Sequence, residues 1–262
     1  MIVFAHGYDV SPDIYSALLN SWVRAGFVVV APFFPDEKAS AVIAQHNANT
    51  EADLVNEPGD IVFVTSRVLA ASAHRVTGCP VLSGLVRPSQ IALAGHSDGG
   101  DAVAMLAYDH AADPQGIVYT ALNTTFTYQA VLILAGAEIP NQRYAATIGH
   151  PSLLVIQSAA DTCNPIAQGT QLYRDVTQPN KWFLELATAH HLSAFDGADQ
   201  PAFREVAAVS THFLESSLGI SHVTPSLMIY ANRDPSVARM LDNQRGPVLR
   251  GLPTLIEACG TT

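Results

Sequence analysis

The stretch IALAGHSDGG, residues 91–100, joins a strand-like apolar run to a turn that is rich in glycine. A helical pattern over 98–110 follows directly. A serine at a sharp strand-to-helix turn has a strained backbone, and a side chain two positions before or after it would clash. Gly95 and Gly99 remove both side chains in the pattern G-x-S-x-G. The stretch therefore predicts Ser97 as a nucleophile at such a turn, in preference to a structural glycine turn.

Short, β-branched apolar segments alternate with longer helical patterns along the rest of the chain. The segments expected to form buried strands are 2–5, 27–33, 90–95, 130–136, 152–158 and 181–186. The helical patterns cover 12–25, 58–76, 98–110, 165–175 and 200–217. This alternation predicts an α/β fold, with a mostly parallel sheet and helices on both faces. The tail 221–262 carries one further strand-like run, SLMIYA.

The composition is that of a globular protein without nucleic-acid or membrane partners. Of its 262 residues, 48% are hydrophobic and 14% are charged, so we expect one domain over 1–262. The net charge is −10 and there is no cluster of Lys or Arg, which disfavours binding to nucleic acid or anionic membranes. No apolar run is long enough to span a bilayer, so a soluble protein is expected.

The cysteines and the start of the chain leave the compartment open. Cys79, Cys163 and Cys259 show no C-x-x-C spacing, so neither a zinc site nor a redox motif is indicated. One disulfide with a free thiol and three reduced thiols are both compatible with the sequence. Residues 2–5 lack the basic region of a signal peptide, so the protein is either cytoplasmic or secreted with a leader that this sequence lacks.

Motifs for metals and organic cofactors are missing from the sequence. It contains neither H-E-x-x-H nor an EF-hand loop, and its 10 histidines are scattered. There is also no G-x-G-x-x-G after the first strand and no Walker A lysine. We therefore expect chemistry that uses no cofactor and no metal.

A serine hydroxyl is a weak nucleophile at neutral pH, so it needs a base and a group that orients the base. In folds of this class an acid and a histidine follow the serine in that order, each on a loop just after a strand. Asp161 comes three residues after the strand expected at 152–158, and His191 comes five residues after the strand expected at 181–186. We therefore predict Asp161 as the acid.

Three other acidic residues are alternatives for this role. Asp175 lies within a helical pattern, where a solvated position is expected. Asp234 follows a strand-like run but comes after the candidate histidines. Glu138 follows the strand expected at 130–136, where it can serve as a displaced acid or contact substrate.

Several histidines compete for the role of base. His190 and His191 are adjacent and only one can face the serine, so the residues alone leave this choice open. His212 lies in the last helical pattern, which favours a place on an amphipathic helix. His96 precedes the serine and is expected to be structural. His6 is expected to brace the loop in which it lies.

An oxyanion hole needs two backbone N–H groups placed where negative charge develops. Asp98, the residue after the serine, is expected to supply one of them. Tyr8 is expected to supply the other from the loop after strand 2–5, where Gly7 lets the backbone turn inward. The ring of Tyr8 is also expected to form a wall of the substrate pocket.

With these residues the chain resembles the α/β-hydrolase superfamily, from IVFAHGYD through GHSDGG and LLVIQSAAD to FLELATAHHLS. Within it, H-G-Y, GFVVVAPFFP, NEPGDIVFV and a histidine five residues after LEL are similar to the dienelactone-hydrolase-like, bacterial cutinase and polyester-hydrolase group, with its chlorophyllase and platelet-activating-factor acetylhydrolase relatives. The resemblance implies that Ser97 is the nucleophile, Asp161 the acid and His191 the base. It also implies that Tyr8 and Asp98 supply the oxyanion hole.

The sequence departs from this group in three places. Relatives usually have two further strands before the first oxyanion loop, so either the sheet lacks them or the sequence begins inside the domain. Polyester hydrolases often have a tryptophan near the strand that corresponds to 130–136, where this chain has Ala137 and Glu138. Their disulfide near the histidine loop has no obvious equivalent. The resemblance thus implies an ester hydrolase more firmly than a polyesterase.

The function expected from the sequence is that of a serine carboxylic-ester hydrolase, similar to an esterase, lipase or cutinase. It would act on a small-molecule or polymeric ester through an acyl-enzyme. The same triad also serves amidases, peptidases and cofactor-free perhydrolases. A non-catalytic ligand receptor with this fold is a further alternative, because such receptors can keep the triad.

Overall fold

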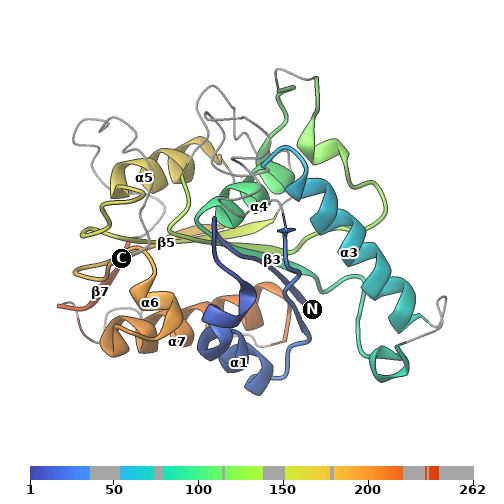
Figure 1. Ribbon diagram of the computed structural model, residues 1–262, viewed down its shortest axis with the longest axis horizontal. Helices are drawn as coiled ribbons and strands as arrows, with labels where there is room; N and C mark the ends of the chain where they lie inside the picture. Colours follow the sequence, from blue (N-terminus) through green and yellow to red (C-terminus); the bar gives the residue numbers. More distant parts are fainter. Residues whose placement is uncertain are drawn as a thin grey trace.

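The structure is a computed structural model that describes residues 1–35, 54–73, 79–113, 116–137, 151–177, 180–220, 234 and 236–241. The described residues form a seven-stranded sheet in the order β2-β1-β3-β4-β5-β6-β7, with helices on both faces (Figure 1). The prediction of a mostly parallel α/β fold is confirmed. None of the helices that the structure describes has the length and apolar character required to cross a bilayer.

The strands follow the sequence pattern closely at the centre of the sheet. Their bounds are β1 (Ile2–Ala5), β2 (Val29–Val30), β3 (Ala92–His96), β4 (Ala130–Leu134), β5 (Ser152–Ser158), β6 (Lys181–Leu186) and β7 (Ala238–Leu241). The first six strands are parallel, and β7 pairs antiparallel with β6. All carboxyl ends of the parallel strands therefore lie at one edge.

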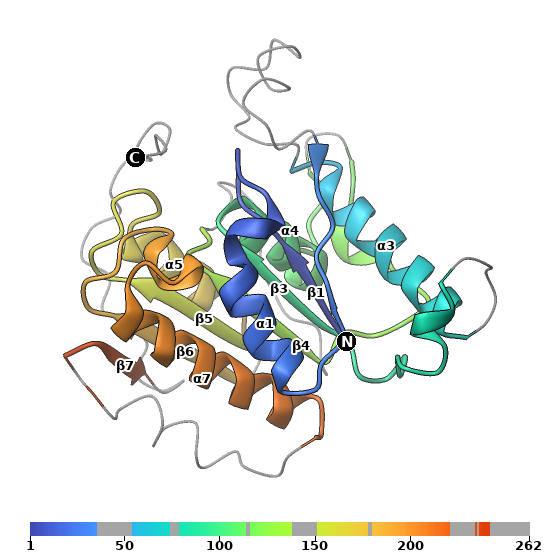
Figure 2. The same cartoon turned by 60° about the horizontal axis from the view of Figure 1, so that its bottom comes forward.

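The helices divide between the two faces of the sheet, as Figure 2 shows. Helices α1 (Ser16–Arg24), α6 (Ser193–Asp196) and α7 (Gln200–Ser217) cover one face. Helices α3 (Glu57–Ser72), α4 (Asp98–Tyr108) and α5 (Ile166–Asp175) cover the other. Short 3-10 helices precede or connect these elements at η1 (Pro12–Tyr15), η3 (Pro80–Leu82) and η4 (Tyr119–Ala121).

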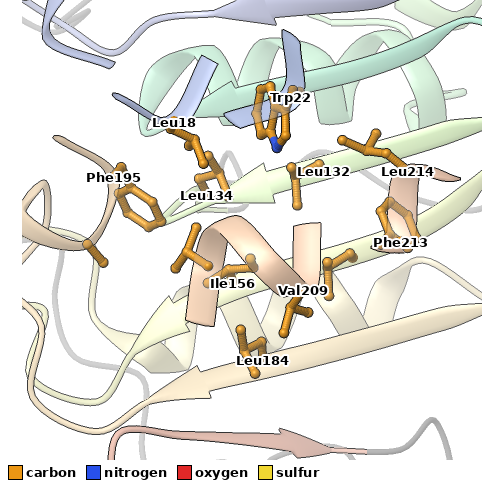
Figure 3. Close-up of a cluster of buried hydrophobic side chains, with 14 of the residues drawn as sticks. Leu18, Trp22, Leu132, Leu134, Ile156, Leu184, Phe195, Val209, Phe213 and Leu214 are labelled. Carbon is orange, nitrogen blue, oxygen red and sulfur yellow. The ribbon is translucent and has the colours of Figure 1, made fainter. Parts of the chain in front are cut away.

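Two cores form because successive side chains of a strand point to opposite faces. Ile2 and Phe4 of β1 pack with α1 and α7, whereas Val3 and Ala5 pack with α3 and α4. Both sets are buried, which explains why the central strands are apolar at nearly every position. Figure 3 shows the first core, where α1 and α7 meet the sheet through Leu18, Trp22, Leu132, Leu134, Ile156, Leu184, Val209, Phe213 and Leu214.

Several predicted boundaries were wrong, and the backbone shows why. The run 27–33 contains only the two-residue strand β2, which is half-buried because it pairs with β1 alone. The strand predicted at 130–136 ends at Leu134, since Ala135 adopts a positive φ of 50° and leaves the extended conformation. Helix α4 ends at Tyr108, before the predicted 110, because the next residue has an extended backbone.

The C-terminal part of the sheet was not predicted. Strand β7 was missed because its short sequence ARML has no alternation or β-branched run. Arg239 of this strand lies 3.2 Å from the carboxylate of Glu185 on β6. The run SLMIYA and most of the segment 36–57 lie outside the described residues.

The apolar core sets the stability of this sheet, and Leu132→Ala tests it. Leu132 is fully buried in the central strand β4. Its truncation should lower the free energy of unfolding by about 2–5 kcal/mol, because a cavity remains. The same change at Leu122, which is 40% exposed, should cost less than about 1 kcal/mol. Urea unfolding followed by circular dichroism measures both, and equal losses would contradict this account of the core.

Candidate active site

The turn between β3 and α4 has the strained geometry that the sequence predicts. Ser97 adopts φ 53° and ψ −124°. A side chain on Gly95 would place its Cβ 2.0 Å from the carbonyl oxygen of Gly99, and a Cβ on Gly99 would lie 2.5 Å from the backbone of Ala5. Both glycines are therefore required because backbone lies against backbone at this turn. Ser97 is 9% exposed, at the N-terminal end of α4.

The loop after β1 lies directly against this turn. A Cβ on Gly7 would be 3.0 Å from Cβ of Ser97. His6 is fully buried, with Nδ1 bonded to the carbonyl of Gly7 at 2.9 Å and Nε2 accepting the N–H of Phe34 at 2.9 Å. His6 therefore braces the loop. Gly7 and Ser97 lie in contact, and they are followed in the sequence by Tyr8 and Asp98 respectively.

Asp161 lies on the loop after β5 with its carboxylate buried and fully hydrogen-bonded. Oδ1 accepts the backbone N–H groups of Cys163 and Asn164 at 2.8 and 3.0 Å. Oδ2 accepts from Nε2 of Gln157 at 3.0 Å and from Nδ1 of His191 at 2.8 Å. Because a carboxylate only accepts, Nδ1 of His191 carries the proton and Nε2 remains as the basic nitrogen.

The sequence reasoning missed the residues that hold this loop. Gln157 of β5 also donates to the carbonyl of Asn164. The side-chain amide of Asn164 donates to the carbonyl of Ala135 at 2.7 Å, which joins the loop to the end of β4. A glutamine in an otherwise apolar buried strand is the signal that can reveal Gln157, because buried polar groups need partners.

The two adjacent histidines after β6 point to different surroundings. His191 contacts Asp161, and its side chain is 19% exposed. His190 is exposed, and its N–H donates to the hydroxyl of Ser193 at 2.9 Å. Of the pair, the structure therefore brings His191 to Asp161.

His96 connects His191 to the serine turn. The two imidazole rings lie 4.7 Å apart, and Nε2 of His96 is 3.0 Å from the carbonyl oxygen of His191. Nδ1 of His96 is 2.7 Å from the hydroxyl of Tyr15, which accepts the N–H of Gly7 at 3.3 Å. Burial, with the nearby His191, lowers the pKa of His96 well below its usual value, and burial raises the pKa of Tyr15.

The other candidates lie elsewhere or are not described. Asp175 is on α5, where it accepts from Gln171. Asp234 is exposed, and His212 lies on α7 beside Glu215. Glu138 falls outside the described residues.

The structure decides between the two alternatives for the cysteines in favour of a disulfide with a free thiol. Cys163 is disulfide-bonded and Cys79 is free. The disulfide-bonded Cys163 lies on the loop that carries Asp161, two residues after it.

The glycine contacts make a prediction about stability. Gly95→Ala should lower the free energy of unfolding or prevent folding, because its Cβ meets the backbone of Gly99. Gly59→Ala is the matched control on α3, where a Cβ meets nothing within 4 Å. It should leave the free energy of unfolding unchanged or raise it by up to about 1 kcal/mol, since alanine has a higher helix propensity than glycine and Gly59 lies in the first turn of α3. Urea midpoints measure both, and a stable Gly95→Ala protein would refute the contact.

The buried histidines predict a pH dependence of stability. Burial lowers the pKa of His6 and His96, so the unfolded chain binds protons that the folded chain does not below about pH 6.5. The free energy of unfolding should therefore decrease as the pH is lowered below about 6.5, by up to about 1.4 kcal/mol per pH unit for each histidine. His96→Asn should give a shallower fall than the unmodified protein, in urea unfolding at about pH 7.5 and 5.5. Equal slopes in the two proteins would contradict this.

With the geometry established, one family match stands out. The model of the chlorophyllase family matches residues 1–125, and no curated protein matches the chain. The matched part runs from β1 to η4 and includes the turn at Ser97. The resemblance to chlorophyllase relatives is thus confirmed, and it indicates an ester hydrolase of the α/β-hydrolase type. Residues 1–125 thus match the chlorophyllase family, which belongs to the α/β-hydrolase superfamily, and the mostly parallel sheet with helices on both faces is consistent with the fold of that superfamily.

Proposed function

We propose that this protein is a serine carboxylic-ester hydrolase. The observation that carries the proposal is the 2.8 Å hydrogen bond between His191 and Asp161. These residues come from loops after β6 and β5, and the turn at Ser97 follows β3, at the same edge of the parallel sheet. A nucleophile, a base and an orienting acid on these three loops are the components of a catalytic triad.

In the proposed reaction His191 first accepts a proton from the nucleophile and then gives it to the leaving group. Nε2 of His191 removes the proton from Ser97 as the hydroxyl attacks the ester carbonyl, and Asp161 stabilises the resulting imidazolium. The N–H groups of Tyr8 and Asp98 stabilise the negative oxygen of the tetrahedral intermediate. The imidazolium then protonates the leaving alcohol. Water, activated by the same base, hydrolyses the acyl-enzyme and restores the hydroxyl.

Aromatic groups beside the oxyanion loop favour an ester with an apolar part. Phe33 is 44% exposed, and its ring lies 5.6 Å from the ring of His6. Tyr8 lies on the oxyanion loop, two residues after His6, and is half-buried. We propose that these rings contact the acyl or alcohol group, as in an esterase, lipase or cutinase-like enzyme. The match to the chlorophyllase family supports ester cleavage over amide cleavage or peracid formation.

Three substitutions test the triad. Ser97→Ala, Asp161→Asn and His191→Gln should each lower kcat on p-nitrophenyl esters by about 10⁴-fold or more. His190→Gln is the matched control, because it makes the same change at the exposed neighbour of the proposed base. It should retain kcat within about twofold, since its side chain has no step to perform. Urea unfolding of all four variants shows whether each protein is folded.

The same assay separates the ester hydrolase from its rivals. Multiple turnover of an ester with slow cleavage of the matching anilide supports the proposal. Equal rates on both would indicate an amidase or peptidase. Tight binding of an ester without turnover, in a folded protein, would indicate a ligand receptor and overturn the proposal, as would full activity in Ser97→Ala.

A further inference from the structure

A chain of three hydrogen bonds, two of them buried and one partly buried, connects the loops of the proposed triad. It begins at the N–H of Gly7, which donates to the hydroxyl of Tyr15 at 3.3 Å. It continues from that hydroxyl to Nδ1 of His96 over 2.7 Å. It ends where Nε2 of His96 meets the carbonyl oxygen of His191 at 3.0 Å. The chain therefore joins the oxyanion loop to the loop of the proposed base.

Only one arrangement of protons satisfies all of these bonds. The carbonyl of His191 can only accept, so Nε2 of His96 must donate. His96 is neutral, because burial and the neighbouring His191 oppose a positive charge on it. Its Nδ1 therefore accepts, and the hydroxyl of Tyr15 donates to it. The lone pair of that hydroxyl then accepts the N–H of Gly7, so each group has a single role.

The rings around this chain hold it in place. The ring of Tyr15 packs at 4.8 Å on that of Phe4, a residue of β1. The ring of Phe195 of α6 packs at 5.0 Å on that of His96. Tyr15 is fully buried and His96 nearly so, and hydrogen bonds are stronger in such an environment than in water.

The chain also distinguishes the two imidazoles that lie 4.7 Å apart. His191 has the carboxylate of Asp161 to stabilise a positive charge, whereas the nitrogens of His96 face a hydroxyl and a carbonyl. A charge on His96 would repel the imidazolium that forms on His191 during ester cleavage. A neutral His96 in a fixed tautomer removes this repulsion and leaves His191 as the base.

We propose that Tyr15 and His96 form a positioning relay that sets the oxyanion loop and the base loop relative to each other. The inference rests on the proposed function, because it assigns a purpose to these bonds in that reaction. Neither residue is catalytic. Both act through others: Gly7 precedes the proposed donor Tyr8, and His96 holds the main chain of His191. Catalytic groups need placement within about 0.5 Å, and two separate surface loops achieve this more readily when they share one buried support.

Three substitutions cut the relay at different bonds. Tyr15→Phe removes the hydroxyl and with it both bonds on the oxyanion side. In His96→Asn the side-chain oxygen can replace Nδ1 as acceptor for Tyr15, but the donation to His191 is lost. In His96→Gln the amide nitrogen can replace Nε2 as donor to His191, but the acceptor for Tyr15 is lost. Tyr108→Phe is the matched control, because it removes a fully buried hydroxyl that donates to the carbonyl of Pro151 at 3.1 Å.

Ester kinetics give the first measurement. Each relay variant should lower kcat by about tenfold with KM within about twofold of the unmodified protein, because the lost placement matters most in the transition state. Tyr108→Phe should lose similar stability but keep kcat within about twofold. Combining Tyr15→Phe with His96→Gln should cost less than the product of the single effects, since both break one chain. Unchanged kcat in Tyr15→Phe would overturn the relay.

Nuclear magnetic resonance gives a second measurement that needs no turnover. The histidine ¹⁵N spectrum of the unmodified protein should show His96 as the neutral tautomer with its proton on Nε2. Tyr15→Phe should shift the signals of His191, including the Nδ1 proton bonded to Asp161, and Tyr108→Phe should not. A protein without esterase activity that shows this tautomer and this shift would retain the relay and lose the proposed function. A proton on Nδ1 of His96, or unshifted His191 signals, would overturn the relay whatever the activity.

Discussion

The carbonyl of Gly99 lies where a side chain on Gly95 would be, so strand β3 and helix α4 meet with backbone against backbone. At this contact Ser97 has a positive φ and stands at the N-terminal end of α4. The same approach places Gly99 against Ala5 and His6, which brings the loop after β1 to the serine. The proposed nucleophile and both proposed oxyanion donors thus depend on the absence of two side chains.

The parallel sheet supplies the remaining groups through its topology. Loops that follow parallel strands all emerge at the carboxyl edge, which is where open α/β sheets bind ligands. Strand β4 separates the serine strand from the strand of Asp161. Asn164 spans this interval through the carbonyl of Ala135, and the backbone at Ala135 turns aside to present it. The strand order thus places these loops at one edge of the sheet, and polar contacts between the loops fix their relative positions.

Local patterns made the sheet and the serine turn predictable, whereas contacts between distant segments did not show in the sequence. The central strands could be predicted because both of their faces are buried and their apolar runs are unbroken. Edge strands β2 and β7 were mistaken or missed, since pairing decides them more than composition does. The residues alone left His190 and His191 open, and only the family resemblance favoured His191, because its contact with Asp161 joins loops that lie 30 residues apart. The partnership of Tyr15 with His96 was not predicted, since it depends on packing between elements far apart in the chain.

The two ends of the sheet differ in a way that bears on its behaviour with other molecules. At one end β2 pairs over only two residues, so it offers little backbone on which a foreign strand can form a ladder. At the other end β7 runs against the direction of its neighbours and carries the charged Arg239. Short strands and charges at an edge are the means by which sheet proteins resist amyloid-like growth. A sheet with so apolar an interior can therefore remain a closed unit rather than a template for aggregation.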